Sequence, residues 1–495
     1  MVPDFSSHSL SRRRFVSLCA GAAVAGSAAL ALPGCVAKSG SSSNGSRASK
    51  SANLSRYISL TVWRGANKLD QGTFSGLTLD AAGHAVLDST AVLDVRTLSD
   101  DYAKKPVDID FEVGTWISPE LELSFGATEL MASWGATIPA GCWLEIEVRG
   151  RRKDGTLSEW LSLARWSGAA EGEDGALSSY SVQQSSEAGS SSACVFEAAE
   201  ERRLYNVQMR ATLMRPLSED AAPSLNMASL VATLFDEDAE LSEYAGEGGT
   251  DPIDVPQYSQ VRASATAAAE GPEYSAPAAC AMLLDWWNAG PSEDELSALG
   301  LASDQRVAWA AAHMVDAQTQ SYDTSAFATS LCASRGLVAY ATRLSGLAQL
   351  EQVLELGVPV AVQLNVTSGN VPDAGYEAAA HAMVVCGIDD EGNVIVNDPA
   401  GVAPALSTVA AQQAASAADQ GIASSEEPVA EGGAESPESA SASSDEAAEE
   451  PATASSQVGD VRRMYPRADF ESAWLNDSAG VAWVVHSAGI AVNVG

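Results

Sequence analysis

The stretch AHAMVVCGIDDEGNVIVNDP, residues 380–399, decides the fold of the second half of this 495-residue chain. Two apolar runs rich in β-branched residues flank the turn-forming residues 389–393, a pattern typical of two antiparallel strands joined as a hairpin. Folding the chain about this turn brings His381 roughly opposite Asp398, and cross-strand neighbours have Cβ atoms ~4.5–5.5 Å apart. A carboxylate at that distance can orient an imidazole, so the hairpin predicts a general base and its orienting group.

A helix start lies upstream of this hairpin. Residues 273–287 read EYSAPAACAMLLDWW and change from turn-forming to helical composition, with Ser275 at the start and Pro277 in the first turn. The positive end of a helix dipole favours an anion, which is why nucleophilic thiolates often lie there. Further upstream, VPQYSQ ends in Gln260, whose side-chain amide could donate a hydrogen bond to a developing oxyanion.

In this order, these segments resemble the C-39-like peptidase family, a papain-fold group related to the peptidases that process bacteriocin leaders. The resemblance covers roughly residues 255–486. It includes the VPQYSQ opening, the helix start, the hairpin, and a closing part formed by VRRMY at 461–465 and FESAWL at 470–475. It implies a papain-like cysteine-peptidase fold for the second half of the chain.

The resemblance also implies roles for individual residues. Gln260 would be the oxyanion donor, His381 the general base and Asp398 its orienting group. Ser275 occupies the position where the family has its nucleophilic cysteine. A thiol, with a pKa of ~8.5, is readily held as a thiolate beside an imidazolium, whereas a serine hydroxyl depends on its base to take the proton during attack.

This substitution leaves two functions open. One expectation is a peptidase homologue with weak or no proteolytic activity that binds peptide or cell-wall peptide in its cleft, with Ser275 serving as a helix cap. The alternative is an active serine- or cysteine-type peptidase or amide hydrolase that uses Ser275, His381, Asp398 and Gln260.

The remaining cysteines and histidines of this half are expected to be structural. Cys280 lies more than one turn past the helix start in an apolar run, and Cys332 and Cys386 lie in similar runs, as small buried side chains do. His313 and His486 have no carboxylate beside them in a hairpin. No histidine, cysteine and acidic residues have the spacing of a zinc site, so we expect neither a metal nor another cofactor.

Residues 56–236 have the pattern of an antiparallel β-sandwich, so the whole chain is expected to be an α+β protein. LELSF at 121–125 and YNVQMRATL at 205–213 alternate apolar and polar residues, as strands with one buried face do. Turn-forming residues separate such runs.

The role of the tryptophans and the state of two cysteines are both open in this region. Packing within the sandwich is the simpler interpretation of the tryptophans, and a platform for carbohydrate is the alternative. Cys142 and Cys194 could form a disulfide in an exported domain. The tryptophans concerned are Trp116, Trp134, Trp143, Trp160 and Trp166.

The N-terminus predicts export. SRRRFV at 11–16 has the twin-arginine pattern, with Arg12 and Arg13 in its arginine run, and the following residues 18–32 are uncharged and rich in alanine, glycine and leucine. This stretch is too short and too rich in small residues for an ordinary membrane-spanning helix.

The end of this signal predicts how the protein is anchored. LPGC at 32–35 resembles a lipoprotein cleavage box whose Cys35 is acylated, although ALA at 29–31 offers a competing cleavage site that would release the protein without lipid. We expect a lipoprotein on the outer face of the cell membrane, or a secreted protein. Its contact with the membrane would be through the lipid alone.

Composition completes the predicted organisation. An insert at about 402–457, rich in alanine, serine and glutamate, contains no lysine or arginine and is expected to be a disordered surface loop. The net charge of −37 argues against nucleic acid as a partner, because phosphates would be repelled. The predicted segments are a signal at 1–35, a Ser/Gly tether at 36–55, the sandwich at 56–236, an acidic linker at 237–254 and the peptidase-like domain at 255–488.

Overall fold

A computed structural model of the chain describes residues 57–171, 173, 175–217, 219–234, 248–260, 274–299, 305–401, 460–476 and 478–494. The predicted signal with Arg12, Arg13 and Cys35, the tether and the insert 402–457 lie outside these residues. In the part that is described, no helix is both long and apolar enough to span a bilayer.

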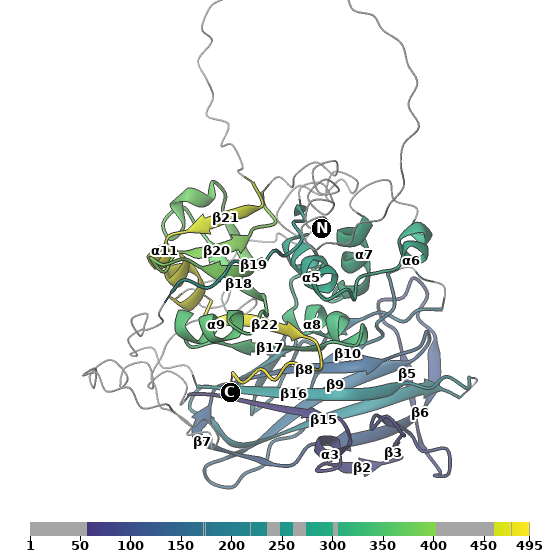
Figure 1. Cartoon of the computed structure of the whole chain (residues 1–495). Helices are drawn as coiled ribbons and strands as arrows, with labels where there is room; N and C mark the ends of the chain where they lie inside the picture. Colours follow the sequence, from purple (N-terminus) through teal and green to yellow (C-terminus); the bar gives the residue numbers. More distant parts are fainter. Residues whose placement is uncertain are drawn as a thin grey trace, which may run out of the picture.

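Residues 58–233 form the predicted antiparallel sandwich (Figure 1). One sheet has the strand order β12-β13-β14-β8-β16-β4-β3, with β1 also on β16; the other has the order β11-β10-β9-β15-β6-β2, with β5 also on β6 and β7 on β15. The first sheet consists of β1 (Ile58–Arg64), β3 (Leu77–Leu79), β4 (Ala85–Leu87), β8 (Glu129–Thr137), β12 (Gln184–Ser185), β13 (Gly189–Ser192), β14 (Val195–Ala198) and β16 (Ser224–Thr233). The second consists of β2 (Thr73–Ser75), β5 (Asp94–Ser99), β6 (Asp108–Ile117), β7 (Leu121–Ala127), β9 (Trp143–Arg152), β10 (Leu161–Trp166), β11 (Tyr180–Ser181) and β15 (Leu204–Pro216), and a short helix α3 (Ala66–Leu69) follows β1.

Tryptophan side chains fill the space between the two sheets. Trp63 on β1 and Trp116 on β6 have ring centroids 5.5 Å apart, and Trp134 on β8 lies 6.2 Å from Trp166 on β10. All four rings are buried. The alternation predicted for β15 is observed from Val207 to Ala211, after which residues 211–214 are all buried.

The second part of the chain, residues 248–494, is called here the C-terminal domain. Its antiparallel sheet has the order β17-β22-β18-β19-β20-β21, and helices lie beside it (Figure 1). The strands are β17 (Val338–Arg343), β18 (Val360–Val366), β19 (Ala378–Ile388), β20 (Val394–Asn397), β21 (Arg462–Tyr465) and β22 (Val481–His486). The helices are α5 (Ser275–Trp286), α6 (Glu293–Ala298), α7 (Gln305–Met314), α8 (Ser325–Ser334), α9 (Leu347–Leu354) and α11 (Arg467–Glu471), with a 3₁₀ turn η3 (Pro372–Ala374) and a π-helical turn η4 (Ser472–Asn476).

The predicted hairpin is β19 and β20, and β21 pairs with β20 on its other side. The insert therefore interrupts the chain between two paired strands. Asp398 N–H donates to the carbonyl of Val461 at 2.8 Å, and Gly401 lies against the backbone of Asp460 so closely that a Cβ at this position would clash with it.

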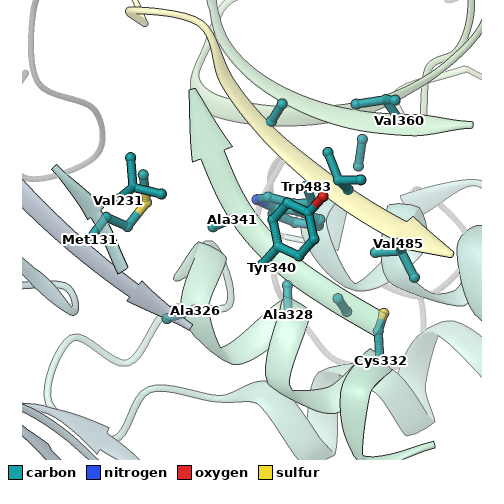
Figure 2. Close-up of a cluster of buried hydrophobic side chains, with 14 of the residues drawn as sticks. Met131, Val231, Ala326, Ala328, Cys332, Tyr340, Ala341, Val360, Trp483 and Val485 are labelled. Atoms are coloured by element: carbon teal, nitrogen blue, oxygen red, sulfur yellow. The ribbon is translucent and has the colours of Figure 1, made fainter. Parts of the chain in front are cut away.

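A shared apolar core joins the sandwich to the C-terminal domain. Phe327 on α8 has its ring centroid 5.0 Å from that of Trp166 and 6.2 Å from that of Trp134. Figure 2 shows Met131 and Val231 of the sandwich in the same cluster as buried residues of α8, β17 and β22. We infer that the two parts fold as one cooperative unit.

One buried ion pair lies at this junction. The guanidinium of Arg343 on β17 donates to both carboxylate oxygens of Glu129 on β8, at 2.9 and 3.0 Å, and both side chains are 2% exposed. Arg343 also donates to the carbonyls of Ser478 and Ala479, so its remaining donors are used within the C-terminal domain. This pair fixes the orientation of one part relative to the other.

Candidate active site

The predicted base and its orienting group are in contact. His381 Nε2 lies 2.9 Å from Asp398 Oδ1, and both side chains are completely buried. They are not directly opposite in the sheet, however. Ile388 pairs with Val394 next to the turn and Val384 pairs with Asn397, so this register continued by one residue sets Asp398 opposite Met383, two residues from His381. Asp398 therefore reaches the imidazole from just beyond the end of β20.

Asp398 is held by several donors at once. Its Oδ2 accepts hydrogen bonds from the hydroxyls of Tyr376 and Tyr465, both at 2.8 Å, and a guanidinium nitrogen of Arg463 lies 3.5 Å away. Oδ1 also accepts from the backbone N–H two residues further along. Burial would raise the pKa of Asp398, but the hydrogen bond and charge of His381, with Arg463 and Tyr465, lower it to about 2. Asp398 is therefore an anion at any physiological pH.

This arrangement determines which nitrogen of His381 can act. Burial and the neighbouring Asp398 raise the pKa of Tyr376 and of Tyr465, so both stay protonated and donate to the carboxylate. Because Asp398 accepts only, the hydrogen bond requires the proton on His381 Nε2. In the neutral imidazole the lone pair then lies on Nδ1, which has no hydrogen-bond partner among the described residues. Nδ1 is the atom available to accept a proton.

Ser275 begins α5 next to the strand that carries this base. Its Oγ accepts a hydrogen bond from the backbone N–H of Ala382 at 3.1 Å, and the side chain is 3% exposed. The expected capping role is wrong. The N-cap of α5 is Tyr274, and in the described part of the chain no side chain caps this helix end. The helix starts one residue earlier than a cap at 275 requires, and the serine hydroxyl faces β19 instead.

Gln260 lies in the same network. Its backbone N–H donates to the carbonyl of Pro399 at 2.9 Å, directly after Asp398. Its side chain is 5% exposed, and its Oε1 has no partner within the described residues. Tyr258, two residues earlier, donates from its hydroxyl to Asp285 on α5. The four predicted site residues thus come together from three separate segments of the chain.

The geometry favours sulfur chemistry over oxygen chemistry at position 275. An attacking serine must pass its proton to the base, which needs an O–H···N contact of roughly 2.6–3.2 Å. Within the described structure, Ser275 Oγ takes a backbone donor and His381 Nδ1 has no partner. A thiolate needs no such hydrogen bond, because an imidazolium beside it has already taken the proton.

The other cysteines and histidines lie outside this network. Cys280 is buried, and its contact with Cys332 together with burial raises its pKa well above the ordinary value. Burial likewise raises the pKa of Cys386 to about 12. His313 and His486 bond through Nδ1 to backbone carbonyls, and burial lowers the pKa of each. The three cysteines are buried in the core, as expected from the sequence.

The structure places the candidate cysteines and tryptophans of the sandwich in different surroundings. Cys142 and Cys194 are both buried and free in the described structure, so the disulfide that the sequence left open is not present there. Trp160 is partly exposed, and the guanidinium groups of Arg149 and Arg210 lie 4.3 and 4.6 Å from its ring centroid. The other candidate tryptophans, Trp116, Trp134, Trp143 and Trp166, are core residues. Within the described ranges, no three histidine, cysteine or acidic side chains are placed to hold a metal ion.

Three residues that hold Asp398 were not predicted: Tyr376, Tyr465 and Arg463. Two of them lie in VRRMY, which the resemblance included without assigning a role to any residue. Tyr376 precedes β19, and its ring centroid lies 5.1 Å from that of His381. A tyrosine just before the histidine strand is the only local signal for this contact.

Comparison with known families agrees with this arrangement. A model of the Peptidase C39 N-terminal domain matches residues 59–233, which are the sandwich, and a model of the Peptidase_C39 like family matches residues 252–416. No curated protein matches the chain. The sandwich thus matches the N-terminal domain of C39 peptidases, and the greater part of the C-terminal domain matches the C39-like peptidase family.

Proposed function

We propose that this chain is an exported, lipid-anchored C39-like peptidase homologue that binds peptide or cell-wall peptide and hydrolyses it weakly or not at all. The observation that carries the proposal is the hydrogen bond from the Ala382 N–H to Ser275 Oγ. A hydroxyl that accepts from the backbone, beside a base to which it does not donate, is poorly placed to attack a carbonyl. Its near-complete burial adds to this.

Export and anchoring form the second part of the proposal. The twin-arginine pattern at Arg12 and Arg13 and the cleavage box at Cys35 support a lipoprotein on the outer face of the membrane. The lipid would be its only contact with the bilayer, and the net charge of −37 argues against nucleic acid. Any carbohydrate contact by the sandwich would involve Trp160, the one partly exposed tryptophan of the five candidates.

A working serine- or cysteine-type peptidase or amide hydrolase is the second candidate. It is favoured by the intact pair of His381 and Asp398, whose carboxylate is held as an anion and fixes the tautomer of the imidazole. In this candidate Ser275 attacks, His381 Nδ1 takes its proton and Gln260 stabilises the oxyanion.

A peptidase assay on the full-length protein separates the two candidates. Wild type, Ser275→Cys and Ser275→Cys with His381→Ala are compared on a mixture of fluorogenic peptides, and binding of the same peptides is measured by fluorescence anisotropy. We expect wild type to bind without turnover. We expect Ser275→Cys to gain hydrolysis by at least about 10²-fold, and His381→Ala to abolish that gain. Ser330→Cys, which places a thiol at a buried serine on α8, is the matched control.

Other results would change the assignment. Covalent labelling of wild type at Ser275 by a fluorophosphonate, lost in His381→Ala, would establish the serine hydrolase instead. Absence of both peptide binding and hydrolysis in wild type and in Ser275→Cys would overturn both candidates.

A further inference from the structure

Two buried sulfur atoms lie next to each other behind the site. Cys280 on α5 and Cys332 on α8 have their Sγ atoms 3.4 Å apart, and the two side chains are 0% and 1% exposed. Figure 2 shows Cys332 at the edge of the buried cluster that includes Ala328 and Tyr340. This closeness distinguishes the pair from Cys142, Cys194 and Cys386, for which the described structure gives no contact with another sulfur.

We propose that Cys280 and Cys332 form a redox site that closes to a disulfide outside the cytoplasm. A disulfide has its sulfur atoms about 2.05 Å apart, so the pair must approach by about 1.4 Å. Helices can shift by this amount against each other without leaving their packing. Oxidising compartments outside the cytoplasm maintain such bonds, and this part of the inference rests on the proposed export.

The oxidant is a disulfide of another molecule, either a small molecule or a thiol–disulfide oxidoreductase. One cysteine thiolate attacks a sulfur of the oxidant, which forms a mixed disulfide and releases the first thiol. The other cysteine then attacks the mixed disulfide at the protein sulfur, which closes the bond between Cys280 and Cys332 and releases the second thiol. The protein loses two protons and two electrons, and the oxidant is reduced to two thiols.

The bond would tie the candidate site to the body of the molecule. Cys280 lies on the helix that begins at Ser275, and α8 packs against β8 of the sandwich through Phe327 and Trp134. The two cysteines are 52 residues apart in sequence, so the bond closes a long loop that includes α6 and α7. Burial and the raised pKa of Cys280 keep the thiolate rare, so we expect formation to be slow and to need transient separation of α5 and α8.

The test is peptide mapping of the full-length protein. Reduced protein is incubated with oxidised glutathione, quenched in acid, denatured, alkylated with iodoacetamide and digested without reductant. We expect a linked pair of peptides that contains Cys280 and Cys332, with Cys142, Cys194 and Cys386 alkylated. The pair should be absent in Cys332→Ala and retained in the matched control Cys386→Ser.

Two outcomes would overturn the proposal at different levels. Complete alkylation of Cys280 and Cys332 after oxidation, including oxidation in mild urea that lets the helices separate, would show that the geometry does not allow the bond. Linkage in vitro but free thiols in protein recovered from the cell envelope would refute oxidation in the cell. Neither readout depends on hydrolysis or peptide binding. The redox proposal therefore fails or succeeds separately from the proposed peptide binding and hydrolysis.

Discussion

Glu197 on β14 offers the sharpest test of how the sandwich is joined to the C-terminal domain. It lies directly opposite Glu129 in the pairing of β14 with β8, and Glu129 is the partner of Arg343. Glu197 therefore lies beside a carboxylate to which the nearby guanidinium is already hydrogen-bonded. Burial and the charge of Glu129 raise the pKa of Glu197 to about 7, despite the opposing effect of Arg343.

The size and sign of the effect follow from this shift. A rise from the ordinary value of 4.5 to about 7 at ~1.36 kcal/mol per pKa unit sets an upper bound of roughly 3.4 kcal/mol. Because Glu197 is partly exposed, solvent screening reduces this to about 1–2 kcal/mol. The folded-state pKa lies above the unfolded value, so this stabilisation is fully present below pH 4.5 and is lost as pH rises through 7.

The measurement is the free energy of unfolding in urea at about pH 4 and about pH 8 for wild type and Glu197→Gln. Wild type should lose about 1–2 kcal/mol more than the variant between the two conditions, because glutamine cannot titrate. Glu187→Gln is the matched control, since Glu187 is 87% exposed and, among the described residues, pairs with the exposed Arg202. Equal losses for wild type and Glu197→Gln would refute the reasoning.

Two further predictions concern buried charges. Arg343→Met leaves Glu129 buried without its cation and should lower the free energy of unfolding by about 3–5 kcal/mol. Adding Glu129→Gln to the same chain should recover part of this loss. A loss under about 1 kcal/mol in Arg343→Met would contradict the role of the pair. Tyr465→Phe removes one hydrogen bond to Asp398, so it should lower the free energy of unfolding by about 1–3 kcal/mol. It should also raise the pKa of Asp398 above about 2, as measured by carboxyl ¹³C NMR titration. An unchanged titration would show that the tyrosine does not hold the carboxylate.

The parts of the site that sequence predicted are those with local signals. Runs of β-branched residues around a turn identified the hairpin of β19 and β20, and a change to helical composition identified the start of α5 at Ser275. Proximity of His381 to Asp398 followed from the hairpin alone. The register did not, because it depends on which residues pair next to the turn, and the pairing of Ile388 with Val394 offsets His381 from Asp398 by two residues.

Contacts between distant segments could not be derived in the same way. Tyr465 lies 67 residues from Asp398, with the insert between them, and nothing in VRRMY shows which side chain turns toward the carboxylate. The pairing of Glu129 with Arg343 joins residues 214 apart in two separately predicted domains. Only the packing of α8 and β17 on β8 brings that charge pair together.

The close approach of Gly401 to Asp460 bears on how the segment between them can be changed in this chain. Since the chain leaves the sheet and returns to it at touching points, the sequence between them can be shortened, exchanged or replaced by a whole foreign module without moving Asp398. Loop-closure theory puts the cost of each doubling in length at only about 0.6 kcal/mol. This junction is therefore a natural splice point, where new binding specificities can be grafted beside the candidate site while its geometry is kept.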